Sequence, residues 1–472
     1  MPELKLARAT LPLVSKSVHT PAYSPTSAQP GVVHLGLGAF HRAHQAMVFD
    51  QLLREGDMRW GIHGVGMTQP GLVNKLRAQD GLYAVRVAGA NGIEWHVPGA
   101  LWQTSVATTE RQHVLNAIAA PSTRWITLTV TEKGYTPALA QLLIDGLRLR
   151  HAAGQAGLTI ASCDNLQGNG HKLKAIIHAT ASSQDAELMT WIEARCAFPC
   201  SMVDRIVPAP TPEVVAMATQ ALGEPAAGAV VAEPFWEWVI EHDFCDPTDA
   251  EVLARVGVTV VDDVSPYEFA KLQLLNGAHS TIAFVGGVAG LDTVYQAMSQ
   301  PWLSRWLRLM MEEELQWGIT RPNTPDYIAQ LLERFANPAL AHKTAQIASD
   351  SSQKIKQRWV PVISAILATG RIPKHLAIAS AAWVHCLKKW RADNQPINDP
   401  LAIDLVASIE ADGHDGARLV RGLLGIERIW TSALTTHDEW IDAVVSAYHA
   451  IAQHGIQTAV ESVAQSAPHH AS

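Results

Sequence analysis

The first 265 residues alternate between two kinds of hydrophobic pattern. Short apolar runs rich in β-branched residues, each ending near a glycine or a polar residue, lie at 32–38, 60–67, 124–135, 158–165 and 258–264. Segments in which apolar residues recur with the helical period lie at 39–56, 171–183 and 185–195. Strands that alternate with helices in this way predict an α/β domain with a parallel sheet, which binds ligands at the carboxyl ends of its strands.

The pattern changes after about residue 265. The helical period then continues with almost no strand pattern, in stretches at 266–285, 300–317, 325–336, 359–369, 375–390, 400–410, 414–424 and 436–465. Residues 1–30 are instead rich in Pro, Ser and Thr. We therefore predict an N-terminal arm at 1–30, an α/β domain at 31–270 and a mostly α-helical domain at 271–472.

Composition and charge fit a soluble enzyme that acts on small molecules. The chain has 472 residues, 48% of them hydrophobic and 17% charged, so it can bury a large core and form two or three domains. The net charge of −8 and the pI near 6.2 provide no basic surface for nucleic acid or for an anionic membrane.

The cysteines and the apolar runs bear on the compartment. Five cysteines, without a CxxC pair, favour a reducing compartment and argue against a zinc ribbon. The first residues, MPELKLARAT, lack the apolar core of a signal peptide, and no apolar run reaches about 18 residues. The cytoplasm is the expected location.

A glycine-rich turn follows the first predicted strand. Gly36 and Gly38 match the first two glycines of the dinucleotide-binding fingerprint, which let the chain turn tightly and a pyrophosphate approach backbone N–H groups. The third glycine is replaced by His41, and such a turn taken alone also fits an ordinary strand-to-helix connection. Its place in the first βα unit favours a Rossmann-type cofactor site. His41 could pack or meet a phosphate, and we favour a place near the cofactor.

The choice between NAD and NADP is left open by the second strand. Its tip, Met67 to Pro70, carries neither the acid that usually contacts the adenosine ribose nor an arginine for a 2′-phosphate.

A lysine, an amide and an imidazole share one predicted helix. At about 100° per residue, Lys271 lies at 0°, Glu268 near 60°, His279 near 80° and Asn276 near 140°. These groups extend over roughly 17 Å, so they can line one wall of a cleft but cannot all meet at one atom. Ser265 and Glu268 also fit a capping box, which leaves Glu268 open between a cap partner and a role near the amine.

This set predicts hydride transfer without a metal. Oxidation of a secondary alcohol needs a base for the hydroxyl proton and donors for the developing alkoxide. The chain has no HExxH and no convincing Cys/His ligand set, whereas a lysine desolvated between domains can serve as the base. We predict Lys271 as that base and Asn276 and Asn165 as donors, although Asn165 alone also fits a turn.

Eight motifs extend over nearly the whole chain. They are HLGLGAFHRAHQA (34–46), DGLYAV (80–85), TVTEKGY (129–135), SCDNLQGNG (162–170), MVDRIVP (202–208), EPFWEWVIE (233–241), KLQLLNGAH (271–279) and HKTAQIASDSSQKIKQR (342–358). Together they resemble the motifs of one known family, the zinc-independent polyol-specific long-chain dehydrogenases, which include mannitol 2-dehydrogenase, arabinitol dehydrogenase and fructuronate reductase.

The resemblance implies roles for most of the candidate residues. Lys271 would be the acid/base, Asn276 and Asn165 would hold the reacting oxygen, and His279 would orient substrate hydroxyls. Glu268 would lie near the lysine as a proton relay, and Asp204 would lie in the substrate pocket. The cofactor, NAD in most of the family, would be contacted by Gly36, Gly38, Ala39, Phe40, His41, Thr131, Glu132, Lys133, Gly134 and Asn165. Many members are monomers, so we expect a monomer, with a dimer as the alternative.

The substrate is expected to be an open-chain polyol or aldonate, oxidised to a ketose or ketouronate. The mannitol/fructose and mannonate/fructuronate pairs remain near-equal candidates. Lys354 or Arg371 could pair with a substrate carboxylate, although each also fits a surface charge.

Two other interpretations remain. Tyr267 and Lys271 match the Tyr-x-x-x-Lys of short-chain dehydrogenases, in which the tyrosine is the acid/base. The chain could also be a sensor of sugar acids or dinucleotides without catalytic activity.

Overall fold

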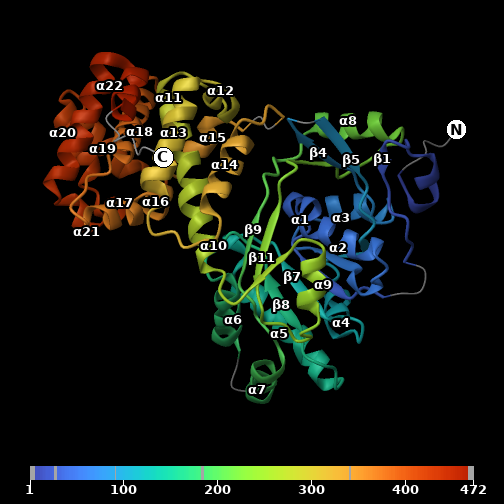
Figure 1. Cartoon of the computed structure of the whole chain (residues 1–472). Helices are drawn as coiled ribbons and strands as arrows, with labels where there is room; N and C mark the ends of the chain where they lie inside the picture. Colours follow the sequence, from blue (N-terminus) through green and yellow to red (C-terminus); the bar gives the residue numbers. More distant parts are fainter. Residues whose placement is uncertain (1–5, 26–28, 91, 182–184, 340–341, 466–472) are drawn as a thin grey trace. The chain divides into compact units, whose positions relative to one another are not determined.

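The computed structural model describes residues 6–25, 29–90, 92–181, 185–339 and 342–465. The chain divides into two compact units, residues 1–265 and 266–472, which we describe separately (Figure 1). The division lies five residues before the predicted boundary at 270/271. In the predicted arm, residues 1–5 and 26–28 lie outside the described residues, and the rest includes the 3-10 helix η1 (Arg8–Leu13) and strand β1 (Val18–His19).

A five-stranded parallel sheet is the framework of the first unit. Its strands, in spatial order, are β6 (Leu101–Val106), β3 (Ile62–Gly66), β2 (Val32–Leu35), β7 (Trp125–Leu128) and β8 (Thr159–Ser162). Every neighbouring pair is parallel. The strand order reverses between β2 and β7, and ligands bind beyond the carboxyl ends of strands at such a point. The predicted α/β class is confirmed.

Helices cover both faces of this sheet. They are α1 (Ala39–Ala43), α2 (Gln45–Arg54), α3 (Pro70–Arg77), α4 (Arg111–Ala119), α5 (Pro137–Ala152), α6 (Asn169–Thr180) and α7 (Ala186–Arg195). Val32 packs into one apolar cluster with Phe49 of α2, and Val33 into another with Leu143 of α5. Because successive strand residues face opposite sides, β2 must be apolar on both. The continuous helix predicted at 39–56 is interrupted at His44, where φ is −128° and ψ is −92°.

Two smaller sheets were not predicted, apart from the strand at 258–264. One has the order β1-β5-β4-β10 and the other β12-β11-β9. Their further strands are β4 (Val85–Gly89), β5 (Gly92–His96), β9 (Ser201–Asp204), β10 (Val230–Ala232), β11 (Glu237–Glu241) and β12 (Thr259–Val261). Helix α8 (Pro212–Leu222) precedes β10. These strands have two to five residues, too few for a period-two pattern to be distinguished from a loop.

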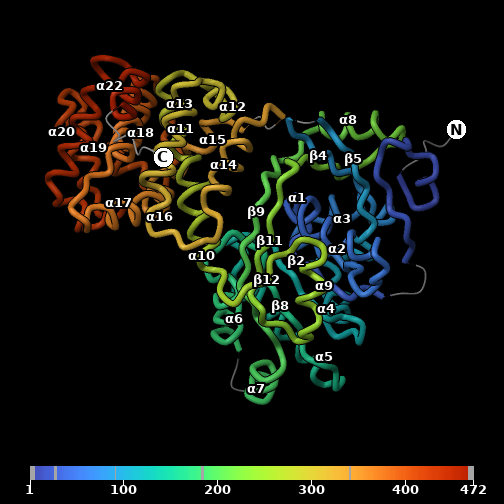
Figure 2. Tube along the Cα trace, in the orientation of Figure 1, coloured from blue at the N-terminus to red at the C-terminus, as the bar shows by residue number. Residues whose placement is uncertain are grey.

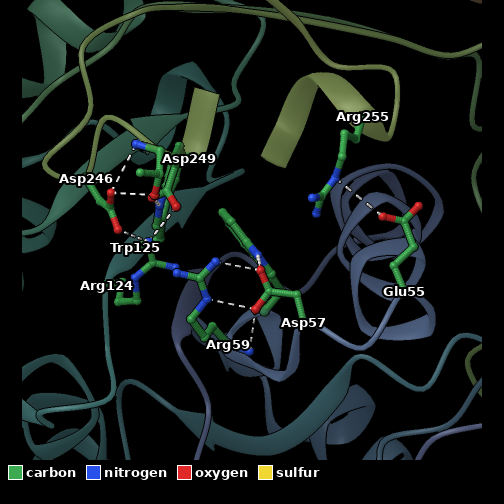
Figure 3. Close-up of polar contacts among 10 residues, drawn as sticks. Glu55, Asp57, Arg59, Arg124, Trp125, Asp246, Asp249 and Arg255 are labelled. Atoms are coloured by element: carbon green, nitrogen blue, oxygen red, sulfur yellow. Dashed lines mark hydrogen bonds and ion pairs between the residues drawn. The ribbon is translucent and has the colours of Figure 1, made fainter. Parts of the chain in front are cut away.

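Polar contacts attach helix α9 (Asp249–Arg255) to the main sheet (Figure 3). Asp249 is buried and accepts hydrogen bonds from the Arg124 guanidinium and from Nε1 of Trp125, the latter at 2.7 Å. At the other end of the helix, Arg255 lies 3.8 Å from Glu55, which follows α2. The buried carboxylate therefore has two donors, which offset its desolvation.

The second unit is helical. After residue 288 it comprises α12 (Val294–Met298), α13 (Pro301–Met310), the π-helical η6 (Met311–Leu315), α14 (Thr324–Phe335), α15 (Thr344–Ala348), α16 (Ser351–Arg358), α17 (Val360–Leu367), α18 (Lys374–Ala392), α19 (Ala402–Asp412), α20 (Gly416–Leu424), α21 (Glu427–Thr435) and α22 (Asp438–Gln465). The trace in Figure 2 shows α18 among the surrounding helices. Twelve α18 residues are buried. Among the described residues, no helix is long and apolar enough to cross a membrane.

Candidate active site

The turn after β2 has the backbone that its glycines predict. Gly36 has a φ of +101°, a conformation that L side chains rarely adopt, and an added Cβ would lie 2.2 Å from the carbonyl oxygen of Thr129. Thr129 Oγ1 donates to the carbonyl oxygen of Gly36 at 2.7 Å. The glycine therefore lets the turn pass against the end of β7.

Gly38 differs from Gly36, because its described neighbours leave room for a side chain. Among the described residues, a Cβ added there would meet only the Gly36 carbonyl oxygen, at 3.9 Å, and φ is −81°. The open space is what the second fingerprint glycine provides, since it lets a pyrophosphate approach the backbone. Ala39 and Phe40, both half-exposed, begin α1 directly after it. This part of the turn fits a dinucleotide.

His41 does not face solvent. Its ring is buried and stacks on the ring of His34, with 3.3 Å between centroids. His34 Nε2–H donates to the Gly36 carbonyl oxygen at 3.0 Å, and its Nδ1 lies 2.8 Å from Thr127 Oγ1. Burial lowers the pKa of His34 to about 3 and the pKa of His41 well below its ordinary value. Both rings are therefore neutral. His41 packs against His34 below the turn and does not offer a positive charge to a phosphate.

A second turn, Thr131–Gly134, follows the end of β7. Asp164, two residues after the end of β8, accepts the backbone N–H of Thr131 at 2.7 Å and that of Val130 at 3.2 Å. Tyr135 OH donates to the same carboxylate at 3.1 Å. Burial raises the pKa of Asp164. Thr131 has a φ of +63°, rare for a β-branched residue, so the carboxylate holds a strained turn in place.

The cofactor candidates of the first unit thus come together at one edge of the sheet. The contact of Gly36 with Thr129 joins the glycine turn to β7, and Asp164 joins β7 to β8. Thr131, Glu132 and Lys133 are exposed and Gly134 is half-exposed. Asn165, exposed beside Asp164, lies at the same edge. These five residues are accessible to a ligand along the carboxyl ends of β7 and β8.

Asp204 is the last residue of β9 and is buried. The next residue, Arg205, donates from Nε to the carbonyl oxygen of Glu233 at 2.9 Å and from Nη1 to that of Ala43. Glu233 Oε1 in turn accepts the backbone N–H of Ile206 at 2.6 Å. The motifs MVDRIVP and EPFWEW therefore fix the end of β9, and with it Asp204, against α1.

In the second unit, the helix around Lys271 departs from the predicted α-helical geometry. Helix α10 (Ser265–Ala270) continues into a π-helical segment, η5 (Lys271–Gly277), and then into α11 (Ala278–Val288). In a π-helix each N–H bonds to the carbonyl five residues earlier, so residue i+5 lies above residue i. Asn276 is five residues after Lys271, and the two share a side. The predicted separation of 140° is wrong because it assumed 3.6 residues per turn.

His279, on the first turn of α11, lies in a basic environment. Its ring is buried against Phe335, with centroids 4.6 Å apart, and meets His342 edge-on at 5.4 Å. Burial is the main cause that lowers the pKa of His279 well below its ordinary value, and the charges that add to it are all basic, from His342, Arg358, Arg334 and Lys354. The imidazole is neutral, so it can both donate and accept.

Of the two candidates for a substrate carboxylate, the structure groups only Lys354 with His279. Lys354 is half-buried and its Nζ donates to the Ile347 carbonyl oxygen at 2.9 Å. Burial lowers its pKa. Arg371 is exposed, with its guanidinium 5.1 Å from the ring centre of Trp317, and is not among the largest charge effects on His279.

Glu268 precedes Lys271 near the start of the same continuous helix. It lies on α10, one turn before Lys271, and Asp263 accepts the N–H of Ser265 at 2.9 Å at the start of that helix. In a capping box, Glu268 would accept the Ser265 N–H. Because Asp263 already accepts that N–H, the structure favours the capping role of Glu268 less than the sequence did.

Several residues of the site were not singled out from the sequence. Arg358 donates from Nη1 to the Asn276 carbonyl oxygen at 3.1 Å and to Ser280 Oγ at 2.8 Å, and Trp359 Nε1 donates to the Gly277 carbonyl oxygen at 3.2 Å. The carbonyl oxygens of Asn276 and Gly277, at the end of η5, therefore accept hydrogen bonds from side chains. The sequence signal was the motif HKTAQIASDSSQKIKQR, which contains Arg358 but shows no partner.

Comparison with known proteins places both units in one family. The family model for the mannitol dehydrogenase Rossmann domain matches residues 30–250, and that for the mannitol dehydrogenase C-terminal domain matches residues 263–452. D-mannonate oxidoreductase of Escherichia coli is 34% identical, over 94% of this chain and 97% of its own. Mannitol 2-dehydrogenase of Aspergillus terreus is also 34% identical, over 93% of this chain and 94% of its own.

A solved structure agrees. Pseudomonas fluorescens mannitol 2-dehydrogenase, in a ternary complex with NAD and D-mannitol, matches with a TM-score of 0.81 and 30% identity, over 98% of this chain and all of its own. The predicted family, Rossmann-type fold and enzyme class are confirmed, and neither the short-chain interpretation nor the sensor is favoured. The chain is a member of the mannitol dehydrogenase family of oxidoreductases.

Proposed function

We propose that this protein is an NAD-dependent oxidoreductase that interconverts an aldonate of the mannonate type with its ketouronate, with Lys271 as acid/base. The observation that carries the chemistry is the π-helical segment that begins at Lys271 and brings Asn276 to the same side. π-Helical turns are frequent at functional sites.

The first unit supplies the residues that would hold the cofactor. Gly36, Gly38, Ala39 and Phe40 leave room for a pyrophosphate, and the exposed turn Thr131–Gly134 and Asn165 lie along the same sheet edge. When bound, NAD supplies the hydride acceptor for alcohol oxidation. The tip of β3 has no arginine for a 2′-phosphate, and the structural relative is a complex with NAD, so we favour NAD over NADP.

The proton is handled by the protein. In the oxidation direction the neutral amine of Lys271 takes the hydroxyl proton of the substrate, and in the reduction direction its ammonium returns a proton to the carbonyl oxygen. The Asn276 amide donates a hydrogen bond to that oxygen, and we assign Asn165 as a second donor. The neutral His279 orients a neighbouring hydroxyl, and Asp204 and Glu268 are proposed as a substrate contact and a proton relay.

Charge favours an acid over a neutral polyol as substrate. The charged groups that act on His279 are basic, and they include Lys354. A substrate carboxylate would be attracted to the Lys354 ammonium, whereas a neutral polyol would not. The D-mannonate oxidoreductase of Escherichia coli acts, by its name, on such a substrate.

One absorbance screen tests the proposal. Formation of NADH or NADPH is followed with mannonate, altronate, mannitol, arabinitol and sorbitol. We expect the highest kcat/KM with mannonate and NAD. A higher kcat/KM for mannitol would reassign the substrate to the neutral polyols, and cofactor binding without turnover of any of the five would favour the sensor.

The proposal also covers location and assembly. Five free cysteines suit a reducing compartment, and we propose the cytoplasm and a monomer.

A further inference from the structure

A cluster of metal-ligating side chains lies in the first unit, apart from the candidate active site. His171 is on the first turn of α6, Cys200 immediately precedes β9, and Glu241 is the last residue of β11. One ligand atom of each lies within 4.8 Å of the other two. Figure 1 shows where these three elements lie in the unit.

The backbone holds this cluster in place. In the antiparallel pairing of β9 with β11, the Glu241 N–H donates to the Cys200 carbonyl oxygen at 3.0 Å, and the Cys200 N–H donates to Glu241 Oε2 at 2.9 Å. A carboxylate has lone pairs beyond those that accept this bond, so Glu241 keeps the capacity to ligate.

The start of α6 is fixed beside the same strand. The Asn169 side chain donates to the carbonyl oxygens of Asp164, at 3.0 Å, and Ser201, at 2.7 Å, and accepts the Ser201 N–H at 2.9 Å. A Cβ on Gly170 would lie 2.4 Å from the Phe198 carbonyl oxygen, so glycine permits this close approach. His171 is therefore presented beside Cys200 by a rigid helix start.

We propose that His171, Cys200 and Glu241 form a zinc-binding site. A thiolate, an imidazole and a carboxylate are all zinc ligands, and the sulfur disfavours the hard cations Ca²⁺ and Mg²⁺. Cys200 is 1% exposed whereas His171 is exposed, so an ion enters from the imidazole side and takes water as its fourth ligand.

A second cluster, His19, Glu94 and His96, is the obvious competitor. Its two imidazole rings are stacked, with centroids 4.7 Å apart and planes inclined by only 19°. A metal ion lies in the plane of each imidazole that binds it, and nearly parallel planes do not share such a point. This cluster also lacks a thiol, and it therefore serves as a control.

The zinc ion would be structural and not catalytic. Cys200 lies four residues before Asp204 along the strand, which corresponds to about 13 Å. An ion there joins α6, β9 and β11 and stabilises the folded state, since it binds only when the three are assembled.

Titration of the metal-free, full-length protein with Co²⁺ and then Zn²⁺ tests the site. We expect one Co²⁺ per chain, a near-ultraviolet charge-transfer band from a thiolate ligand, displacement by Zn²⁺ and a higher Tm. Cys200→Ser should abolish the band, and His171→Gln, a change at an exposed position, should weaken binding at least tenfold. Cys245→Ser, at an exposed cysteine, and His19→Gln should change neither the band nor the affinity for the metal.

Three results would overturn the proposal. They are a wild-type protein without the band, a band that persists in Cys200→Ser, and an unchanged affinity in His171→Gln. Binding that is lost in His19→Gln but retained in Cys200→Ser would assign the metal to the stacked histidines. Turnover of the metal-free enzyme should equal that of the zinc-loaded enzyme, and a loss of turnover without zinc would contradict a purely structural ion.

Discussion

The carboxylate of Asp164 accepts the backbone N–H of Thr131 at 2.7 Å, and it does so at a residue whose φ is +63°. Asp164 follows β8 and Thr131 follows β7. One side chain therefore determines the shape of the exposed turn that we assign to the cofactor, and Asp164 is a positioning residue.

Asp164→Asn should weaken NADH binding. The amide keeps one acceptor but turns its NH₂ toward a backbone N–H, and hydrogen bonds to charged groups contribute about 1.5–3 kcal/mol. We expect the Kd for NADH, measured by fluorescence titration, to rise about 10- to 100-fold. Asp243→Asn is the matched control, because the Asp243 carboxylate also accepts a backbone N–H, that of Phe198, but follows β11. An unchanged Kd in Asp164→Asn would refute the positioning role.

The two glycines of the first turn should respond differently to alanine. Gly36→Ala places a methyl group against the Thr129 carbonyl oxygen at a φ of +101°, so it should lower Tm strongly or prevent folding. Gly38→Ala has open space and should leave Tm nearly unchanged while it weakens NADH binding. Thermal unfolding and NADH titration of both variants check this. A Gly38→Ala variant that binds NADH normally would show that this glycine does not contribute to cofactor binding.

The sequence predicted four of the five strands of the large sheet, because β2, β3, β7 and β8 are runs of four or five residues that are buried throughout. The hydrophobicity of these runs is enough to distinguish them from the residues around them. The sequence did not predict β6, which has exposed and half-exposed positions. The strands of the small sheets have two to five residues, and β5 is largely exposed, so the chain shows no such contrast there.

The candidate site was predictable as residue types but not as geometry. Lys271, Asn276 and His279 stood out by spacing, yet nothing in KLQLLNGAH distinguishes a π-helix from an α-helix. The side chains that bond to the carbonyl oxygens at the end of the π-helical segment, Arg358 and Trp359, follow more than 80 residues later. His41 faces the core and not a phosphate because His34, seven residues earlier, offers a ring to stack on.

Acid should destabilise the first unit through His34. Burial lowers the folded-state pKa of His34 to about 3, below its unfolded value near 6.5. The unfolded chain therefore binds the proton first, and the stability present above about pH 6.5 is lost as pH falls toward 3. The slope is up to about 1.4 kcal/mol per pH unit for this group.

Urea unfolding between pH 7 and 5 measures that slope. His34→Gln should show a shallower dependence on pH than the wild type, whatever its absolute stability. His113→Gln, at an exposed position on α4, should keep the wild-type slope. Equal slopes for the wild type and His34→Gln would contradict the claim that His34 takes up the proton on unfolding.

Lys354→Met should separate acidic from neutral substrates. Loss of the ammonium removes an attraction for a carboxylate, so we expect the KM for mannonate to rise at least tenfold and that for mannitol to change less than twofold. Arg371→Met is the matched alternative and should change neither value. The reverse pattern would move the carboxylate site to Arg371.

The most direct test of the central claim compares mannonate oxidation by Lys271→Ala and Tyr267→Phe, followed as NADH absorbance from pH 6 to 10. The account predicts that Lys271→Ala loses about 10²- to 10⁴-fold in kcat, as expected for removal of a general base. It also predicts that the wild-type rate rises as the amine loses its proton, and that Tyr267→Phe keeps both the rate and the profile. A Lys271→Ala variant with the wild-type rate and pH profile, or an inactive Tyr267→Phe variant beside it, would contradict the account.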